Sequence, residues 1–221
     1  MWDTPSAQRA GVWGIRSLPS AITDSQIEKN NKGMRRIVVS EFLTLDGVME
    51  DPGGAEDFEY GGWSLRFFNE EYLKFKYDEL FSSGALLLGR VTYEIFAEAW
   101  PSRTHQEGFA DCMNSMPKFV VSNSLNKLRW KNSQLIKGDV VKQIQNLKQD
   151  NGKDILVAGS GQLVHTLMEH NLVDEFRLMI HPIVLGTGKR LFNDLNGMKT
   201  FKLWEARAFS SGIVVFVYHH D

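Results

Sequence analysis

The feature that most constrains this chain is an alternation, from Arg35 onward, of short β-branched runs with stretches of helical periodicity. Strands joined by crossover helices produce this alternation, so the sequence predicts an α/β fold with a mostly parallel central sheet and flanking helices in three layers. Several runs are apolar throughout, as expected of strands that are covered on both faces. The expected strands span residues 37–42, 85–88, 118–122, 154–158, 175–185, 201–209 and 213–218.

Three stretches between these strands carry apolar residues at helical spacing. Asp139 is expected to cap the second helix at its N-terminus, and Gly152 to stop it. Residues 210–212, Ser-Ser-Gly, form a turn signal between the last two strands, which predicts a C-terminal antiparallel hairpin and therefore a mixed sheet. The periodic residues are Phe68, Tyr72 and Phe75, then Val140, Ile144 and Leu147, then Leu163 and Leu167.

Residues 1–33 differ from the rest of the chain, because Ser, Gln, Asn and Gly are frequent and the apolar residues keep no sustained period. The segment also lacks the compact apolar region of a secretory signal. We expect a flexible N-terminal tail over residues 1–33. A single working domain is then expected over residues 34–221, beginning at Met34.

Charge and composition exclude several classes of function. The formal net charge is -2 and no long basic run is present, so nucleic acid is not an expected partner. Cys112 is the single cysteine, which rules out an intrachain disulfide and a cysteine-based zinc cluster and favours a cytoplasmic protein. No apolar stretch approaches the roughly 18 residues of a membrane span. His165 and His170 would face different sides of a helix, so no metal is expected.

The clearest local signal is a buried-type strand that runs into Gly159, Ser160 and Gly161 and then into a helix. Glycines allow a ligand to approach the backbone, and free N–H groups at a helix start attract phosphate. A valine at Gly161 would occupy this space and disfavour a positive φ there. The full dinucleotide fingerprint is absent, because Val164 stands at the third glycine position. A plain chain reversal is the alternative interpretation.

Two more strands are followed by groups that suit a phosphate. Gly89 and Arg90 follow one strand, and Thr92 could cap the next helix, although Arg90 could equally be a solvated surface charge. Ser122 and Asn123 follow another strand, where they could also be simple turn residues. Ligands of open α/β sheets bind at the carboxyl ends of the strands, so these three elements together predict a phosphate-binding edge.

Several further short motifs occur one after another along the chain. Leu45-Asp46-Gly47 ends the first strand, Trp63 precedes a helix, and residues 87–94 read LLGRVTYE. Residues 120–124 read VVSNS, and VDEF at 173–176 is followed by HPIVLGTGKRLF at 181–192. This set resembles the dihydrofolate reductase superfamily, and more closely the riboflavin-biosynthesis reductases of the RibD C-terminal family. The resemblance runs from Met34 to the C-terminus.

The resemblance implies a reductase that binds NADPH and transfers a hydride to a small pyrimidine or pterin-like heterocycle. One candidate substrate is the phosphoribosylaminopyrimidine of riboflavin synthesis. It also implies a homodimer, which the apolar C-terminal strands favour as well. The residues expected to hold the cofactor are Gly47, Gly89, Arg90, Thr92, Ser122, Asn123, Gly159, Ser160, Gly161, Gln162 and Leu163.

Catalytic and substrate-binding residues are less constrained. Asp46 and Glu70 are the expected acid/base residues, although Asp46 could simply form a turn. Glu41, Trp63, His181 and Gly186 are expected on the substrate side, and a structural role for His181 stays open.

Two features of the chain depart from the family pattern and keep other functions open. Dihydrofolate reductases place a carboxylate five residues after the tryptophan, whereas Phe68 stands there in this chain. The zinc deaminase half of the bifunctional riboflavin enzyme needs paired cysteines that this chain lacks. A dihydrofolate or pteridine reductase, and a sensor that binds NADPH without turnover, therefore remain alternative functions.

Overall fold

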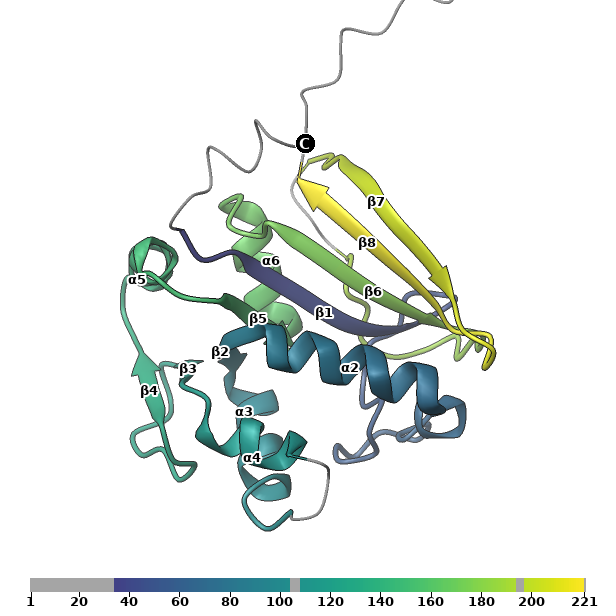
Figure 1. Cartoon of the computed structure of the whole chain (residues 1–221), viewed down its shortest axis with the longest axis horizontal. Helices are drawn as coiled ribbons and strands as arrows, with labels where there is room; N and C mark the ends of the chain where they lie inside the picture. Colours follow the sequence, from purple (N-terminus) through teal and green to yellow (C-terminus); the bar gives the residue numbers. More distant parts are fainter. Residues whose placement is uncertain (1–33, 104–107, 194–196, 221) are drawn as a thin grey trace, which may run out of the picture. The chain divides into compact units, whose positions relative to one another are not determined.

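The computed structural model describes residues 34–103, 108–193 and 197–220, and the predicted tail lies outside the described residues. The described part contains an eight-stranded sheet in the order β4-β3-β2-β5-β1-β6-β8-β7 (Figure 1). The strands are β1 (Ile37–Thr44), β2 (Ser83–Gly89), β3 (Lys118–Val121), β4 (Ser133–Ile136), β5 (Asp154–Ala158), β6 (Glu175–His181), β7 (Phe201–Ala208) and β8 (Val214–His220).

The sheet is mixed, as predicted. The six strands from β4 to β6 pair in parallel, and β8 pairs antiparallel with both β6 and β7. The turn between β7 and β8 closes where Gly212 donates its N–H to the Phe209 carbonyl at 2.9 Å. The predicted α/β fold and the C-terminal hairpin are therefore confirmed.

Two strand predictions were wrong. The strand expected over residues 175–185 ends at His181, because Pro182 has no N–H to continue the ladder. The edge strand β4 was not predicted, because its sequence Ser-Gln-Leu-Ile is short and half polar. It pairs with β3 from Lys118 to Val121.

The helices are α2 (Glu70–Ser82), α3 (Arg90–Ala99), α4 (Phe109–Ser115), α5 (Val140–Gln149) and α6 (Gly161–Glu169), with a 3-10 turn η1 (Leu65–Phe67). The predicted cap of α5 is confirmed, since Asp139 accepts from the Lys142 N–H at 3.0 Å. The predicted stop at Gly152 lies beyond the helix end, which has Asp150 as its C-cap. None of the helices in the described ranges is long and apolar enough to cross a bilayer.

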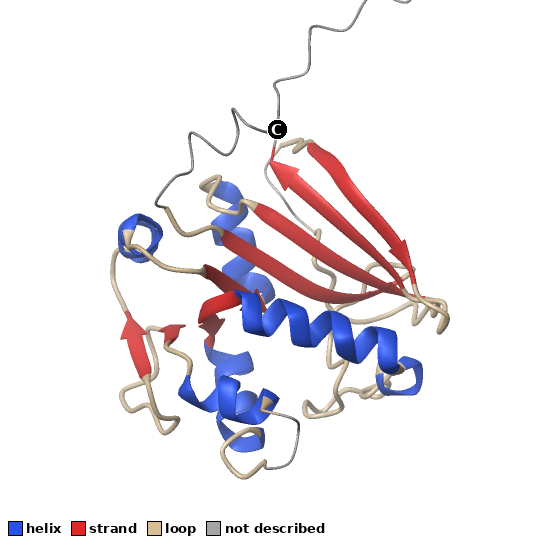
Figure 2. Ribbon diagram, viewed as in Figure 1, coloured by secondary structure: helices blue, strands red, loops and turns tan. Residues whose placement is uncertain are grey.

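The helices cover both faces of the sheet (Figure 2). Ile144 of α5 and Leu167 of α6 pack with Val39 and Val157 on one face. Helices α2, α3 and α4 pack on the other face. Because α2 and α6 leave the neighbouring strands β1 and β5 toward opposite faces, a crevice is expected where these two strands end.

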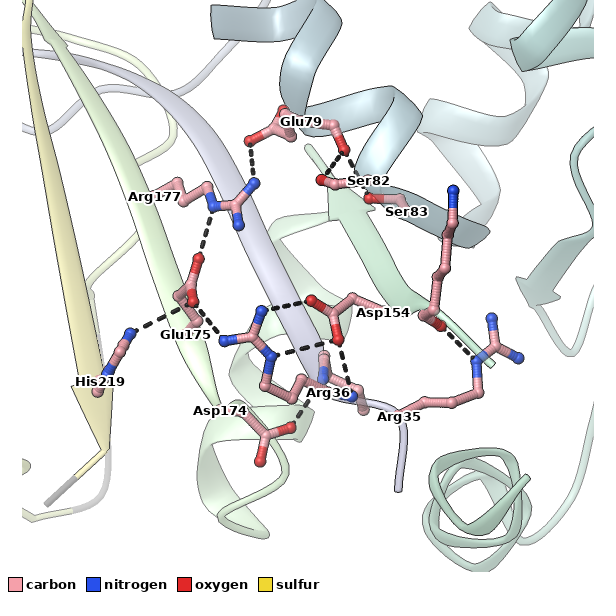
Figure 3. Close-up of polar contacts among 12 residues, drawn as sticks. Arg35, Arg36, Glu79, Ser82, Ser83, Asp154, Asp174, Glu175, Arg177 and His219 are labelled. Carbon is pink, nitrogen blue, oxygen red and sulfur yellow. Dashed lines mark hydrogen bonds and ion pairs between the residues drawn. The ribbon is translucent and has the colours of Figure 1, made fainter. Parts of the chain in front are cut away.

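A network of ion pairs lies near the amino ends of the strands, opposite the carboxyl ends where the crevice is expected (Figure 3). Arg36 lies between Asp154, at 2.5 Å, and Glu175, at 2.9 Å. Arg177 pairs with Glu175 at 2.6 Å and reaches Glu79 of α2 at 3.6 Å. The network links β5, β6 and α2 to Arg36, the residue before β1. It therefore helps to fix the register of these strands and the position of their carboxyl ends. Partly buried ion pairs of this kind often add little net stability, because desolvation offsets the attraction between the charges.

Candidate active site

Two glycine turns meet at the carboxyl edge of the sheet. One follows β2 at Gly89, and the other follows β5 at Gly159 and Ser160. The Gly89 N–H donates to the Ser160 Oγ at 2.9 Å, and the Ser160 N–H donates to the Thr92 Oγ1 at 3.0 Å. These two bonds hold the N-termini of α3 and α6 side by side. The positive ends of two helix dipoles thus converge, which is an arrangement that favours an anion.

The turn after β5 has left-handed backbone at two successive residues. Gly159 has φ +54° and Ser160 has φ +65°. A Cβ at Gly159 would lie 2.9 Å from the Thr92 Oγ1, so only glycine allows the two turns to approach this closely. The Ser160 hydroxyl donates to the Ala158 carbonyl at 3.0 Å, which gives this left-handed serine a partner inside its own turn.

Two expectations about this region were wrong. Thr92 does not cap α3, because that helix begins at Arg90 with Gly89 as its N-cap and without a side-chain cap. Its hydroxyl serves the neighbouring turn instead. Gly161 does not have a positive φ, which occurs at the two preceding residues. A Cβ at Gly161 would lie 2.9 Å from the Sδ of Met49, so the close neighbour of this glycine is a flexible side chain of the first loop.

The other predicted cofactor residues lie on α3, directly after β3, and on α6. Arg90 is half exposed and pairs with Glu94 one helical turn later at 2.7 Å. The Ser122 Oγ accepts from the N–H groups of Ser124 at 3.3 Å and Leu125 at 3.1 Å, whereas Asn123 is exposed. On α6, Gln162 is exposed and Leu163 is buried in the core. Arg90, Asn123 and Gln162 are therefore the side chains that a ligand at this edge could reach.

Asp46 joins the loop after β1 to the loop after β6. Its carboxylate accepts from the Thr44 hydroxyl at 2.6 Å and from the Gly186 N–H at 2.9 Å. Arg190 donates to the Asp46 carbonyl at 2.9 Å. The Thr44 hydrogen bond and the backbone donors lower the pKa of Asp46 to about 2. The group is therefore ionised at neutral pH and holds the two loops together. Gly47 begins the return of the first loop with φ +79°.

His181 lies fully buried at the end of β6. Its Nδ1 contacts the carbonyls of Met179 at 2.9 Å and Leu43 at 3.3 Å. Its ring lies edge-on to Trp63 at 5.1 Å and to Phe42 and Phe67 at 5.6 and 5.7 Å. Burial lowers the pKa of His181, so the imidazole is neutral, and its Nε2 has no partner among the described residues. The Trp63 indole N–H donates to the Glu50 carbonyl at 2.7 Å.

Two further carboxyl groups have contrasting environments. Glu41 on β1 is 2% exposed, and its Oε1 has no hydrogen-bond partner in the part of the chain that the structure describes. Glu70 is exposed in the first turn of α2. Between Trp63 and this helix, Phe68 stacks on Tyr72 with ring centroids 4.2 Å apart. The position of the folate-reductase carboxylate is thus part of an apolar pair.

Three contributors to this edge were missed at the level of sequence. Met49 lies against Gly161, Thr44 holds Asp46, and Arg190 holds the first loop. The Gly-Thr-Gly-Lys-Arg run of residues 186–190 was a signal for the last of these, whereas Met49 carried none. Among the described residues, no group of three His, Cys, Asp or Glu side chains could hold a metal ion.

The mixed sheet and its flanking helices form a dihydrofolate reductase-like fold, as solved structures of similar arrangement show. The chain matches the RibD C-terminal domain family over residues 35–215 and belongs to that family. It is 32% identical over 193 residues to YyaP, an uncharacterized protein of Bacillus subtilis, with 86% of this chain and 97% of YyaP covered.

Two solved structures share the fold. One is the Thermotoga maritima diaminohydroxyphosphoribosylaminopyrimidine deaminase/5-amino-6-(5-phosphoribosylamino)uracil reductase, with a TM-score of 0.59 and 16% identity, covering 89% of this chain and 59% of that one. The other is dihydrofolate reductase from Enterococcus faecalis complexed with NADP(H), with a TM-score of 0.56 and 12% identity, covering 84% and 96%.

Proposed function

We propose that the protein is an NADPH-dependent reductase that transfers a hydride to a small pyrimidine or pterin-like heterocycle. The observation that carries this proposal is the pair of cross-bonded glycine turns, which brings the N-termini of α3 and α6 together. Two converging helix N-termini suit a pyrophosphate better than a single charge. The Enterococcus faecalis reductase of the same fold was solved with NADP(H), which supports this cofactor.

The residues of this edge fit such a cofactor. Gly89, Gly159, Ser160 and Gly161 would border the pyrophosphate, and Thr92 would keep their backbone in place. Gln162 and Leu163 continue the first turn of α6, and Gly47 belongs to the first loop, whose Met49 lies against Gly161. When bound, the cofactor would supply the hydride, while the protein would supply position and electrostatics.

The preference for NADPH over NADH is assigned to Arg90, with Asn123 and Ser122 beside it. Arg90 pairs with Glu94 at the surface, and exposed pairs at this spacing contribute only about 0.3–0.5 kcal/mol. A ribose 2′-phosphate can therefore replace Glu94 at small cost. A guanidinium group binds phosphate through short, charge-assisted hydrogen bonds.

On the substrate side, the proposal keeps Trp63, His181 and Gly186, of which Gly186 is exposed and the other two are buried. Asp46 is ionised and acts as a positioning residue that holds Gly186 in the second loop. Glu70 is then the carboxyl group proposed to transfer a proton, because it is exposed at the start of α2. The apolar Phe68–Tyr72 pair disfavours folate as the substrate and favours a heterocycle that is protonated from another direction.

Turnover separates this proposal from its alternatives. NADPH oxidation would be followed with the phosphoribosylaminopyrimidine of riboflavin synthesis and with dihydrofolate as acceptors. We expect oxidation with the pyrimidine. Faster turnover of dihydrofolate would favour a pteridine reductase, and binding without any oxidation would favour a sensor, for which the missing carboxylate at Phe68 is the supporting observation.

We also propose a cytoplasmic homodimer. Strand β7 lies at the edge of the sheet, and its Leu203 and Trp204 are 49% and 55% exposed. Exposed apolar side chains on an unpaired edge strand are a liability that a second copy would cover. Light scattering at micromolar concentration should give twice the chain mass of 25.2 kDa, whereas a monomer would contradict this part of the proposal.

A further inference from the structure

We propose that Glu41 recognises the carboxamide group of the nicotinamide ring, and so selects the reactive end of the cofactor. This inference rests on the proposed function. The glycine turns and Arg90 would contact the phosphates of the cofactor and not its nicotinamide ring. The inference assigns the contact with that ring to the buried side chain of Glu41.

The register of the sheet places Glu41 at the point where β1 and β5 diverge. Ser40 pairs with Ala158, so the next residue on each strand brings Glu41 beside Gly159 of the glycine turn. By alternation, Glu41 shares a face of β1 with Val39 and Leu43, which pack in the cluster beneath α6. Its carboxyl group thus lies beside the Gly159 amide, at the point where the helices that follow the two strands leave to opposite faces, which is where open α/β sheets bind ligands.

The carboxyl group lacks a full set of partners. Its Oε1 is buried and unpartnered among the described residues, and native proteins rarely leave such an atom without a reason. Lys76 acts electrostatically on this carboxyl group, but its amine contacts Glu79 and donates to the Ser40 hydroxyl at 3.0 Å. Burial raises the pKa of Glu41 well above its ordinary value, against the opposing effects of Lys76 and the Gly159 amide, and Glu79 raises it further.

A neutral carboxyl group at this position is complementary to a primary carboxamide. The acid offers one O–H donor and one carbonyl acceptor, and the carboxamide offers an N–H donor and a carbonyl acceptor. The two groups can therefore exchange a pair of hydrogen bonds. An ionised carboxylate has only acceptors and could make one of these bonds but not the other.

The test uses two ligands that share the adenosine with its 2′- and 5′-phosphate groups, only one of which carries the nicotinamide mononucleotide half. NADPH and adenosine 2′,5′-bisphosphate, which lacks that ring, would be titrated against the full chain and the variants Glu41→Met and Glu41→Gln. Circular dichroism and thermal unfolding of each variant would report on the fold. Methionine has a similar shape without the polar head, whereas glutamine keeps one N–H donor and one carbonyl acceptor.

We expect Glu41→Met to weaken NADPH about tenfold, as for a lost buried hydrogen bond, while the bisphosphate affinity stays unchanged. Glu41→Gln should keep NADPH affinity to within about threefold, because it mimics the neutral acid. Equal losses for both ligands in a folded Glu41→Met variant, or unchanged NADPH affinity, would overturn the inference. Wild type that binds neither ligand would overturn the proposed function as well.

Discussion

Ser160 donates its backbone N–H to the Thr92 hydroxyl at 3.0 Å, although the two residues lie 68 positions apart in the chain. This bond joins the start of α6 to the first turn of α3. Together with the return bond from the Gly89 N–H to the Ser160 Oγ, it fixes the distance between the two helix N-termini. The geometry proposed to bind the pyrophosphate therefore depends on a threonine side chain as much as on the glycines.

Replacing Thr92 by valine tests this dependence. The Thr92→Val substitution keeps the shape but removes the acceptor of the Ser160 N–H, which should lower the free energy of unfolding by about 1–2 kcal/mol and weaken NADPH binding. Thr92→Ser keeps the hydroxyl and should lose little of either. Urea unfolding and a cofactor titration measure both effects. If valine and serine variants bound NADPH equally, the hydroxyl would have no part in shaping the site.

Gly159 offers a test of the backbone conformation. The Gly159→Ala substitution places a Cβ 2.9 Å from the Thr92 Oγ1 at a residue with φ +54°, so we expect a loss of about 1–3 kcal/mol in the free energy of unfolding. Gly53→Ala is the matched control, because a Cβ there meets nothing within 4 Å and its φ is not positive. The control should change stability by less than about 0.5 kcal/mol. Equal effects would contradict the packing described for the two turns.

Arg90→Ala should weaken NADPH by roughly ten- to a hundredfold and hardly change NADH. Hydrogen bonds to charged groups contribute about 1.5–3 kcal/mol, and every 1.4 kcal/mol is about tenfold in affinity. Glu94→Gln is the companion variant: it removes the carboxylate that competes with the phosphate, and we expect it to strengthen NADPH by about twofold. Both cofactors would be titrated against the wild type and the variants. Equal losses of affinity for NADPH and NADH in Arg90→Ala would contradict the assignment of Arg90 to the ribose phosphate.

The lowered pKa of Asp46 predicts that the stability of the fold depends on pH. Its pKa is about 2 in the folded chain and about 3.9 when unfolded, so the ionised group stabilises the fold above pH 4 and this contribution is lost as the pH falls toward 2. Because the side chain is 19% exposed, we reduce the full linkage value to about 1 kcal/mol. Asp46→Asn should cost that amount at pH 7 and almost nothing near pH 2. A stability difference that did not change with pH would contradict the clamp between the two loops.

Much of the fold could be predicted because it depends on patterns that are local in sequence. The strand over residues 154–158 and the Asp139 cap agree with the structure to the residue, since a buried apolar run and a capping aspartate each act within a few positions. Strand β4 could not be predicted, because its pairing with β3 decides its conformation and Ser-Gln-Leu-Ile has no strong preference.

The site was less predictable than the fold for the same reason. The glycine turns could be found from their position after apolar strands, but the sequence does not reveal that Thr92 serves a turn 68 residues away. The position of the positive φ was also misjudged by one to two residues, because left-handed backbone at Ser160 depends on its contacts with Gly89 and Ala158. Long-range contacts of this kind are not encoded in residue type and spacing alone.

Calorimetric titration of the full chain with NADPH and then NADH tests most directly whether the paired turns bind NADPH. We expect saturable binding of one NADPH per chain, with NADH at least about tenfold weaker because it lacks the phosphate that Arg90 would hold. Absence of saturable binding by either nucleotide would contradict it.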